Sequence, residues 1–402
     1  MIFNFLEKEN ILTFSKNLLL QNSGITPAIV TKIRKQFPQI SLEELKVIID
    51  IAVGSIHAQQ SGKFSQAYSD WLFTKQTYEQ STSEFIAEHH ASKFKNIESI
   101  LEICTGAGID TSILAKTGKP VVTIESNKLI SNLAIRNFTK HHLNNITLLQ
   151  GEAENIIDKT INLDRFKGLW ADPSRRASDG KRLSIIESDY QPNLRWLLNL
   201  SINGIMGIKI SSAINLDYLP DGWKREWIGY KNECKEQILW KNCDVQEGTI
   251  SLIDKHSSWS PDYLNIKPTE IVIPVNKVHY LVDPHSCLVR SGYLAEFYHK
   301  NNIGLFDHRI GYGIGNSAPD FSDFYSIFEI IEQSDFNYKY LQNRILTLNW
   351  NKETEIKKRG FPELPDEVRK KLRFSNGDEK GVIILSKIDN KKIVFLAKRI
   401  LL

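Results

Sequence analysis

The sequence predicts an α/β protein with a mostly parallel sheet, preceded by a helical domain and followed by an α+β region. Three observations lead to this fold class. Strand and helix patterns alternate between residues 100 and 210, a Gly-x-Gly turn joins the first strand to the first helix, and an antiparallel strand pair follows the series. A chain of 402 residues exceeds one ordinary core and indicates two or three domains.

Residues 1–77 are expected to form the helical N-terminal domain. Thr26 and Pro27 are a cap and a proline at the first helical position, and residues 41–44 (SLEE) form a capping box before an apolar helix. A further helical stretch runs from about 78 to 94. The charges of this domain are mixed and it shows no recognisable chemistry, so we expect a structural or docking role.

Apolar runs rich in β-branched residues mark the strands of the sheet. The expected strands are 100–103, 121–124, 146–149, 166–171 and 205–210, with a helix at 129–138. Residues 223–230 and 236–240 flank a short polar turn and predict an antiparallel hairpin that closes the sheet. The pattern then predicts one small α+β unit or two, with a strand at 280–282, helices at 287–298 and 367–372, and strands 382–385 and 393–396 joined through Asp389 and Asn390.

Composition excludes several classes of protein. The four cysteines are scattered without a CxxC pair, which argues against a disulfide framework or a zinc ribbon. Charged residues interrupt the apolar N-terminus, so we expect a cytoplasmic protein with no signal peptide, no spanning helix and no membrane partner. The histidines show no metal-ligand spacing, so no metal site is predicted and they are expected at the surface or at helix caps.

The formal net charge of +4 is modest, and its distribution matters more than its size. Basic runs lie near the C-terminal end, at 357–359, 369–373, 391–392 and 398–399. Such runs suit an RNA-phosphate surface and an ordinary solvated face about equally.

The stretch SILEICTGAGID (residues 99–110) forms a strand, a glycine turn and the start of a helix. A dinucleotide site would require Gly-x-Gly-x-x-Gly, but Cys104 stands at the first glycine position and the third glycine is missing. Glu102 and Asp110 flank the turn, where they would repel a pyrophosphate and attract a cation. The turn alone is equally compatible with a segment that binds no ligand.

The same stretch resembles the first motif of class I methyltransferases, whose cofactor S-adenosylmethionine carries an ammonium and a sulfonium. The closing hairpin is typical of that class, whereas a nicotinamide-binding sheet usually adds a parallel sixth strand. Taken together, EQST, ILEICTGAGIDT, VVTIES, WADPSRR, CKEQILW, YLVDPHSCLVRSGYLAEF and the chain from IKKRG onward resemble a bacterial family of class I, or Rossmann-like, methyltransferases with a THUMP-like C-terminal domain.

The resemblance implies a domain order, a cofactor and a partner. The domains are the helical domain at 1–77, a methyltransferase domain at 78–275, a ferredoxin-like segment at 276–322 and a THUMP-like domain at 323–402. The implied cofactor is S-adenosylmethionine. THUMP domains proper bind RNA, usually the acceptor end of tRNA, so the implied substrate is structured RNA, tRNA or rRNA, and a DNA partner is not expected.

The cofactor positions implied by the resemblance are Glu102, Gly106, Gly108, Glu125 and Glu152, with Cys104 and Asp110 in the turn and Ala153 beside Glu152. Glu125 ends the second strand, 17 residues after Gly108, where a carboxylate can accept both hydroxyls of the adenosine ribose. Glu152 would face the adenine amino group, and Ala153 would leave room beside the ring. An acidic residue at a strand end also often has no function.

The stretch WADPSRR holds the candidate transfer centre. Asp172, fixed by Pro173, would stand beside the transferred methyl group and accept a proton. Amino-directed nucleic-acid methyltransferases have Asp/Asn-Pro-Pro-aromatic here, so Ser174 and Arg175 argue against an exocyclic-amine target. The pattern Asp-Pro-x-Arg is closer to uridine C5 methyltransferases, but the nearby cysteines lie in or beside the hairpin, and a covalent mechanism is not expected. Arg175 and Arg176 could bind a substrate phosphate or anchor the loop.

The leading hypothesis is an S-adenosylmethionine-dependent methyltransferase that acts on structured RNA. One alternative is a non-catalytic RNA-binding or assembly protein with a methyltransferase-like domain, which Cys104 and the missing aromatic residue after Pro173 would suit. A methyltransferase for a protein or a small molecule is a further alternative. A nicotinamide oxidoreductase fits least, because of the acidic residues at the turn.

Overall fold

The computed structural model divides the chain into two compact units. The first unit comprises residues 1–225 and 236–245, and the second comprises residues 226–235 and 246–402. The residues described are 8–22, 24–175, 187–214, 216, 219–262, 278–305, 307, 309–388 and 391–401. The domain boundaries at 77, 275 and 322 stay predictions. Among the described residues, no helix has both the length and the apolar character needed to cross a membrane.

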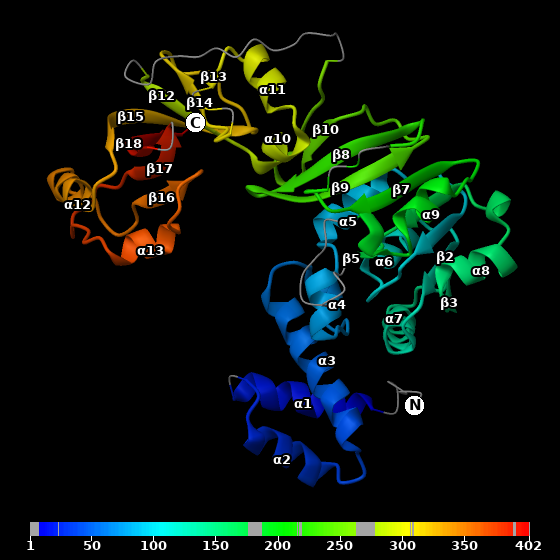
Figure 1. Cartoon of the computed structure of the whole chain (residues 1–402). Coiled ribbons are helices and arrows are strands. Elements are labelled where there is room, and N and C mark those ends of the chain that lie inside the picture. The colour runs from blue at the N-terminus through cyan, green and yellow to red at the C-terminus, as the bar shows by residue number, and fades with distance from the viewer. Residues whose placement is uncertain are drawn as a thin grey trace. The chain divides into compact units, whose positions relative to one another are not determined.

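Among the described residues, the first unit opens with the α-helices α1 (Glu9–Gln21), α2 (Pro27–Gln36), α3 (Leu42–Gln60), α4 (Lys75–Gln80) and α5 (Glu84–Ser92) (Figure 1). Both predicted caps are confirmed, since the Thr26 side chain accepts from the Ile29 amide and Ser41 forms its capping box with Glu44. The expected helix at 78–94 is wrong as one element. Ser81 has an extended backbone that ends α4, and α5 begins three residues beyond it, at Glu84.

The sheet of the first unit has the predicted parallel core. Its strands and helices are β1 (Ile100–Ile103), α6 (Ile109–Ala115), β2 (Val121–Glu125), α7 (Lys128–Lys140), β3 (Ile146–Gln150), α8 (Ala153–Thr160), β4 (Gly168–Ala171), α9 (Leu194–Asn199) and β7 (Ile205–Ile210). The strand order is β7-β4-β1-β2-β3, and all four pairs are parallel. The pairing brings the strand ends Ile124, Ile103, Ala171 and Ile208 into one row.

The predicted closing hairpin is also confirmed. It consists of β8 (Trp223–Tyr230) and β9 (Glu233–Lys241), and the division between the two units passes through both strands. β9 pairs antiparallel with β7, with Ile208 opposite Leu239 and Ile210 opposite Gln237. A short two-stranded ribbon, β5 (Ser174–Arg175) with β6 (Tyr190–Gln191), follows the end of β4.

The strands of the first unit are apolar on both faces, as expected for a parallel sheet covered by helices. Their core includes Leu101, Ile103, Leu169, Met206 and Ile208, all fully buried. Burying one such side chain contributes about 1.5–3 kcal/mol, so this core fixes the strand ends rigidly.

The second unit is built on a seven-stranded sheet in the order β13-β14-β12-β15-β18-β17-β16. The strands of this sheet are β12 (Tyr280–Pro284), β13 (Gly304–Leu305), β14 (Gly313–Gly315), β15 (Tyr325–Asp335), β16 (Glu355–Lys358), β17 (Val382–Ile388) and β18 (Lys391–Ile400). The unit also contains β10 (Thr249–Leu252) and β11 (Ser257–Trp259). β10 pairs parallel with β8, and β11 pairs antiparallel with β10. The helices of the unit are α10 (Ser286–Ser291), α11 (Leu294–Lys300), α12 (Tyr338–Thr347) and α13 (Pro365–Lys370).

Two expectations for the second unit meet different outcomes. The strands expected at 382–385 and 393–396 are confirmed as β17 and β18, and the turn at 389–390 lies outside the described residues. The single helix expected at 287–298 is wrong. Gly292 has a left-handed backbone (φ +80°) that ends α10, and α11 starts beyond it.

Candidate functional site

The glycine turn after β1 is held in a left-handed conformation. Cys104, Gly106 and Gly108 have φ values of 73°, 56° and 88°. A Cβ atom on Gly108 would lie 2.4 Å from Cε1 of Phe138, so only glycine fits there, whereas a Cβ on Gly106 would meet no atom within 4 Å. The turn therefore leaves open space at Gly106 at the carboxyl end of the sheet, where ligands of open α/β sheets bind.

Glu125 borders this space at the end of β2. Its side chain is mostly buried, with Oε2 accepting from the Gly106 amide (3.0 Å) and Oε1 from the Asn127 amide (2.8 Å). Burial raises the pKa of Glu125, and the amide hydrogen bonds oppose the rise. Each carboxylate oxygen keeps a lone pair, so the group can still accept hydrogen bonds from a pair of hydroxyls.

Glu102 is enclosed at the same turn. It is 1% exposed and accepts hydrogen bonds from Thr111 and from Thr123, the latter at 2.6 Å. Burial raises the pKa of Glu102 to about 8, although both threonine hydroxyls oppose the rise. These bonds fasten the end of β1 to α6 and β2. Contact between this carboxylate and a cofactor stays a prediction.

Asp172 directly follows β4 and forms an ion pair with Lys209 of β7, 2.8 Å between Oδ2 and Nζ. The Lys209 side chain is only 6% exposed and also donates to Oγ1 of Thr82 (2.9 Å). Because β4 and β7 pair in register at Ala171 and Ile208, the next residue of each strand lies at the same edge of the sheet. Burial raises the pKa of Asp172, and the Lys209 ammonium opposes the rise.

Three further charged side chains form a chain of contacts that starts at Lys209. Glu236 of β9 lies 3.6 Å from Lys209, His90 of α5 donates to Glu236 (2.5 Å), and the other ring nitrogen of His90 lies 3.0 Å from Asp110. We call Asp110, His90, Glu236, Lys209 and Asp172 the buried charge cluster. When every member is ionised, two positive and three negative charges leave one negative charge at the strand ends.

The cluster shifts the pKa values of its own members. Burial alone would lower the pKa of His90, but Glu236 and Asp110 outweigh it and raise the pKa to about 9. Burial alone would raise the pKa of Glu236, but Lys209 and His90 outweigh it and lower the pKa to about 2. Burial would likewise lower the pKa of Lys209, but Asp172 and Glu236 raise it. His90, Lys209 and Glu236 therefore hold each other in the charged form near pH 7.

Sequence reasoning missed three members of this cluster. Lys209 and Glu236 were not singled out, and the surface or capping role expected for His90 is wrong, since this residue is 1% exposed. The capping expectation is confirmed for His285, whose Nδ1 accepts from the Cys287 amide (3.2 Å). A signal for Lys209 existed, because a lysine inside the apolar strand IMGIKI has to find a buried partner.

The other candidate residues differ in their surroundings. Glu152 is exposed at the start of α8, and Ala153 is buried as the first residue of that helix. Pro173 is buried, and Arg175 is half-buried in β5 opposite Tyr190. Arg176 lies outside the described residues. The roles proposed for these residues stay predictions.

Cys104 is joined to the short ribbon that follows Asp172. Its thiol donates to the Gln191 carbonyl (3.9 Å), and burial raises the pKa of this thiol well above its usual range. A thiol that stays protonated is a poor nucleophile, so this cysteine packs within the turn.

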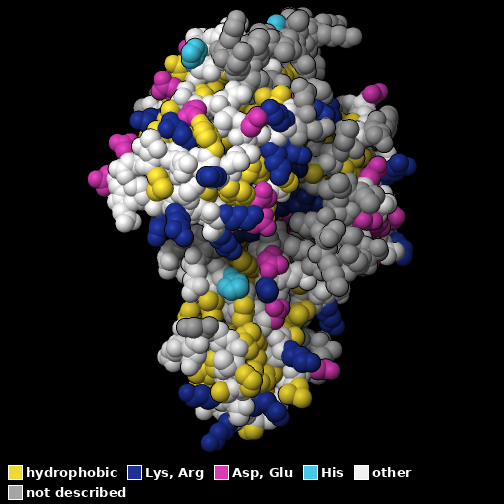
Figure 2. All heavy atoms as spheres, turned by 60° about the vertical axis from the view of Figure 1, so that its left-hand side comes forward, with side chains coloured by type: hydrophobic (Ala, Val, Ile, Leu, Met, Phe, Trp, Pro, Cys, Tyr) yellow, Lys and Arg dark blue, Asp and Glu magenta, His cyan; other side chains and the backbone are white. Residues whose placement is uncertain are grey.

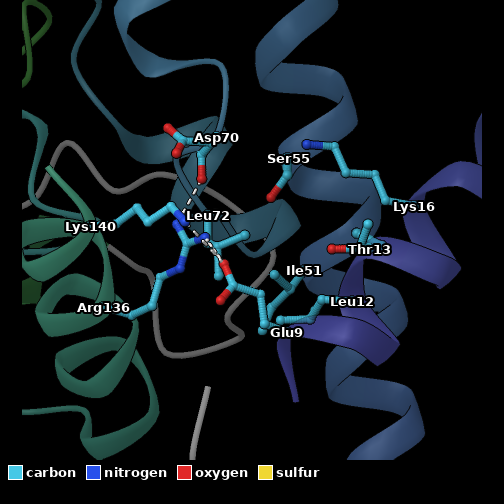
Figure 3. A pocket seen from close by; sticks show the side chains of 11 residues that line it. Glu9, Leu12, Thr13, Lys16, Ile51, Ser55, Asp70, Leu72, Arg136 and Lys140 are labelled. Carbon is cyan, nitrogen blue, oxygen red and sulfur yellow. Dashed lines mark hydrogen bonds and ion pairs between the residues drawn. The ribbon is translucent and has the colours of Figure 1, made fainter. Parts of the chain in front are cut away.

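A pocket of about 210 Å³ lies elsewhere in the first unit (Figure 3). It is lined by Glu9, Leu12, Thr13, Lys16, Ile51, Ala52, Ser55, Asp70, Leu72, Arg136 and Lys140. Its charges compensate each other, since Glu9 pairs with Arg136 (2.8 Å) and Lys140 (3.8 Å), and burial with the nearby Arg136 lowers the pKa of Lys16. The pocket contains none of the strand-end residues, so we place the candidate site at the glycine turn.

Comparison with known proteins gives concordant similarities. Residues 325–399 match the family described as THUMP domain-like. Two proteins of Mycobacterium tuberculosis, from strains CDC 1551 / Oshkosh and ATCC 25618 / H37Rv, are each 25% identical over 324 residues, which is 79% of this chain and 85% of the relative. Both are described as uncharacterized S-adenosylmethionine-dependent methyltransferases.

A crystal structure shares the fold over nearly the whole length. The protein comes from Porphyromonas gingivalis W83, and its name describes it as a candidate methyltransferase. The match covers 99% of this chain and 100% of that chain, with a TM-score of 0.69 and 17% sequence identity. The parallel strand order and the closing hairpin agree with this likeness. The chain thus has the class I methyltransferase fold, with a THUMP-like domain at residues 325–399.

Proposed function

We propose that this S-adenosylmethionine-dependent methyltransferase transfers the methyl group to structured RNA, tRNA or rRNA. The observation that carries the cofactor site is the acidic edge of the sheet: open space at Gly106, bordered by Glu125 and followed by the buried charge cluster with its excess negative charge. Such an edge repels a pyrophosphate and attracts a cation.

The residues at this edge fit S-adenosylmethionine, which supplies a methyl group already attached to a good leaving group. Glu125 would accept the ribose hydroxyls beside the open space at Gly106. The carboxylates of Asp110 and Asp172 would balance the positive charge of the cofactor, and their side chains are 12% and 25% exposed. Asp172 reaches solvent more than the rest of the cluster and is placed to meet the methyl acceptor.

The RNA substrate rests on the second unit. Residues 325–399 are THUMP-like. Figure 2 shows one face of the whole molecule, with Lys and Arg side chains spread over it and Asp and Glu among them. Among the described residues of the C-terminal basic runs, Lys370, Arg373, Lys392 and Lys398 are exposed and have no ion pair with a carboxylate. These four cations are available to phosphates.

Isothermal titration with S-adenosylmethionine tests the cofactor site. We expect Glu125→Ala to weaken binding by about tenfold to hundredfold, because hydrogen bonds to a buried carboxylate are lost. Glu88→Ala, at an exposed position of α5, is the matched control and should bind like the wild type. Equal affinity of Glu125→Ala and wild type would exclude Glu125 from the site.

Transfer of a labelled methyl group to total RNA and, separately, to total protein tests the substrate. We expect label in RNA, lost in Asp172→Ala. Label in protein alone would contradict the RNA substrate and favour a protein methyltransferase. Cofactor binding without transfer to either pool would instead favour the non-catalytic assembly role.

A further inference from the structure

A lysine ammonium lies at the candidate transfer centre, next to the carboxylate that ends β4. Nζ of Lys209 donates to Asp172 (2.8 Å) and Thr82 (2.9 Å), while Oε2 of Glu236 lies 3.6 Å away, beyond a normal hydrogen bond. Among the described residues, one N–H of this ammonium therefore has no short partner. A substrate atom that meets Asp172 also meets a positive charge.

The surroundings fix that positive charge. Lys209 faces carboxylates from three elements: Asp172 after β4, Glu236 on β9 and, through His90, Asp110 on α6. His90 also packs against the ring of Trp170, with 4.4 Å between ring centroids. Packing and charge pairing together hold the ammonium in place without reorganisation, which is the condition for electrostatic stabilisation of a transition state.

A carboxylate next to an ammonium distinguishes between methyl acceptors. An amine becomes more positive as it attacks a sulfonium-bound methyl group, and the nearby Lys209 charge opposes that change. A hydroxyl becomes more negative as its proton leaves, and the same charge stabilises the oxygen. Asp172 supplies the base for that proton, and the absence of the Pro-aromatic pair after Pro173 removes the usual platform for an amino-bearing base.

We propose that the methyl acceptor is a hydroxyl oxygen of the RNA, the ribose 2′-OH, held between Asp172 and Lys209. This inference rests on the proposed function. Within an RNA strand the 2′-OH is the hydroxyl that every nucleotide offers, and it both donates and accepts hydrogen bonds. It would donate to Asp172 and accept from the N–H of Lys209 that makes no short hydrogen bond.

The chemical step balances with these groups. The hydroxyl oxygen forms a bond to the methyl carbon, and the carbon–sulfur bond of the cofactor breaks with its electron pair remaining on sulfur. The hydroxyl proton passes to the Asp172 carboxylate. The positive charge of the sulfonium and the negative charge of the carboxylate are both lost, so the net charge of the site is unchanged.

The position of the methyl group on the RNA is the decisive measurement. Total RNA from a strain that lacks the gene is incubated with wild-type protein and methyl-labelled S-adenosylmethionine, then digested to nucleosides and resolved by mass spectrometry. We expect the label on ribose, together with alkali-resistant dinucleotides, because a 2′-O-methyl group blocks cleavage of the adjacent phosphodiester. Label on a base would overturn the inference and leave the RNA methyltransferase function standing. Label on no RNA would overturn both.

A charge-removing variant tests Lys209 itself. We expect Lys209→Met to lower the transfer rate by about hundredfold or more, as for loss of a preorganised charge donor, while calorimetry still detects binding of S-adenosylmethionine, because the carboxylates at the sheet edge remain. The exposed Lys95→Met is the matched control and should transfer at the wild-type rate. A folded, cofactor-binding Lys209→Met with wild-type transfer would overturn the role of the ammonium.

The pH profile separates this role from a purely structural one. Because Lys209 opposes the upward shift in the pKa of Asp172, its removal should move the acid limb of the rate profile to higher pH. Lys209→Arg keeps the charge and should keep the limb near its wild-type position. An acid limb that Lys209→Met leaves in place would contradict the proposal, and the product measured with wild-type protein decides the acceptor even if Lys209→Met does not fold.

Discussion

The protonation of His90 couples the stability of the first unit to pH. The pKa of this residue is about 9 in the folded protein, raised from 6.5, so the folded state binds the proton more tightly than the unfolded state. Its contribution is fully present below pH 6.5 and is lost as pH rises through 9. The contribution is on the order of 3 kcal/mol, so the thermal midpoint of the wild type should fall between pH 6.5 and 9.5.

The matched comparison for this prediction is His90→Gln, which cannot carry the charge. Glu102 also makes stability depend on pH, because its pKa is raised from 4.5 to about 8 in the folded protein. The folded state therefore binds this proton more tightly than the unfolded state, and stability falls as the pH rises through the range between the two values. Both proteins contain that residue, so the difference between their midpoints reports His90. Equal losses in midpoint for the two proteins across pH 6.5–9.5 would show that His90 stays neutral.

For individual residues, the sequence predicted which side chains lie at the strand ends better than it predicted which side chains they contact. Asp172 and Glu125 could be identified because each follows an apolar run at a position known in advance to face the ligand edge of a sheet. Lys209 was visible as a charge in an apolar strand, but its partner depended on which strand lies beside β7. His90 and Glu236 come from elements far apart in the chain, and no local pattern reports such a contact.

The contact of α3 with the segment before α4 depends on one glycine. A Cβ atom on Gly54 would lie 2.4 Å from the backbone carbon of Thr74 and 2.5 Å from the carbonyl oxygen of Phe73. The Phe73 amide also donates to Ser55 Oγ (3.1 Å), so this backbone cannot move away without losing a buried hydrogen bond. Gly54→Ala should therefore destabilise the protein by about 1–3 kcal/mol, although alanine normally favours a helix.

Thermal unfolding checks this prediction, with Lys46→Ala on the exposed side of α3 as control. We expect the midpoint of Gly54→Ala to fall by several degrees and that of Lys46→Ala to stay close to the wild type. A Gly54→Ala midpoint at or above that of the wild type would mean that helix propensity outweighs the close approach.

Elements with local signals were predicted well. Thr26, Ser41 and Glu44 reveal their helix starts because a cap is satisfied by its own neighbours. The breaks at Ser81 and Gly292 were missed because apolar spacing continues across both sites, and only the backbone conformation ends the helix. The spacing of apolar residues indicates which face of a helix is buried, but it does not indicate whether one helix continues or a second helix begins.

At the scale of the whole chain, most C-terminal basic residues have structural partners. Lys357 and Arg359 both pair with Asp283 at 2.9 Å, and Arg399 pairs with Glu355 at 2.7 Å. Basic runs in the sequence such as 357–359 therefore contain more positive charges than are available to bind RNA, because some of these charges are already paired with carboxylates. Among the described residues of these runs, Lys370, Arg373, Lys392 and Lys398 are exposed and have no ion pair with a carboxylate, and they lie in three separate runs.

Replacing these four residues by glutamine should weaken RNA binding and reduce its salt dependence. Each phosphate contact releases a counterion, so the slope of log affinity against log salt should fall in magnitude by about 3 to 4 when four phosphate contacts are lost. Affinity for total tRNA, measured between about 50 and 200 mM salt, gives this slope. Because the proposed cofactor site lies in the first unit, affinity for S-adenosylmethionine should not change.

A control with the same change of charge distinguishes a binding surface from bulk electrostatics. Glutamine at the exposed residues Lys32, Arg34, Lys35 and Lys46 of α2 and α3 also lowers the formal net charge from +4 to zero. If the second unit binds RNA, this control keeps the wild-type slope. Equal loss of slope in both variants would mean that RNA responds to total charge alone, and the THUMP-like domain would then provide no phosphate-binding surface at these four positions.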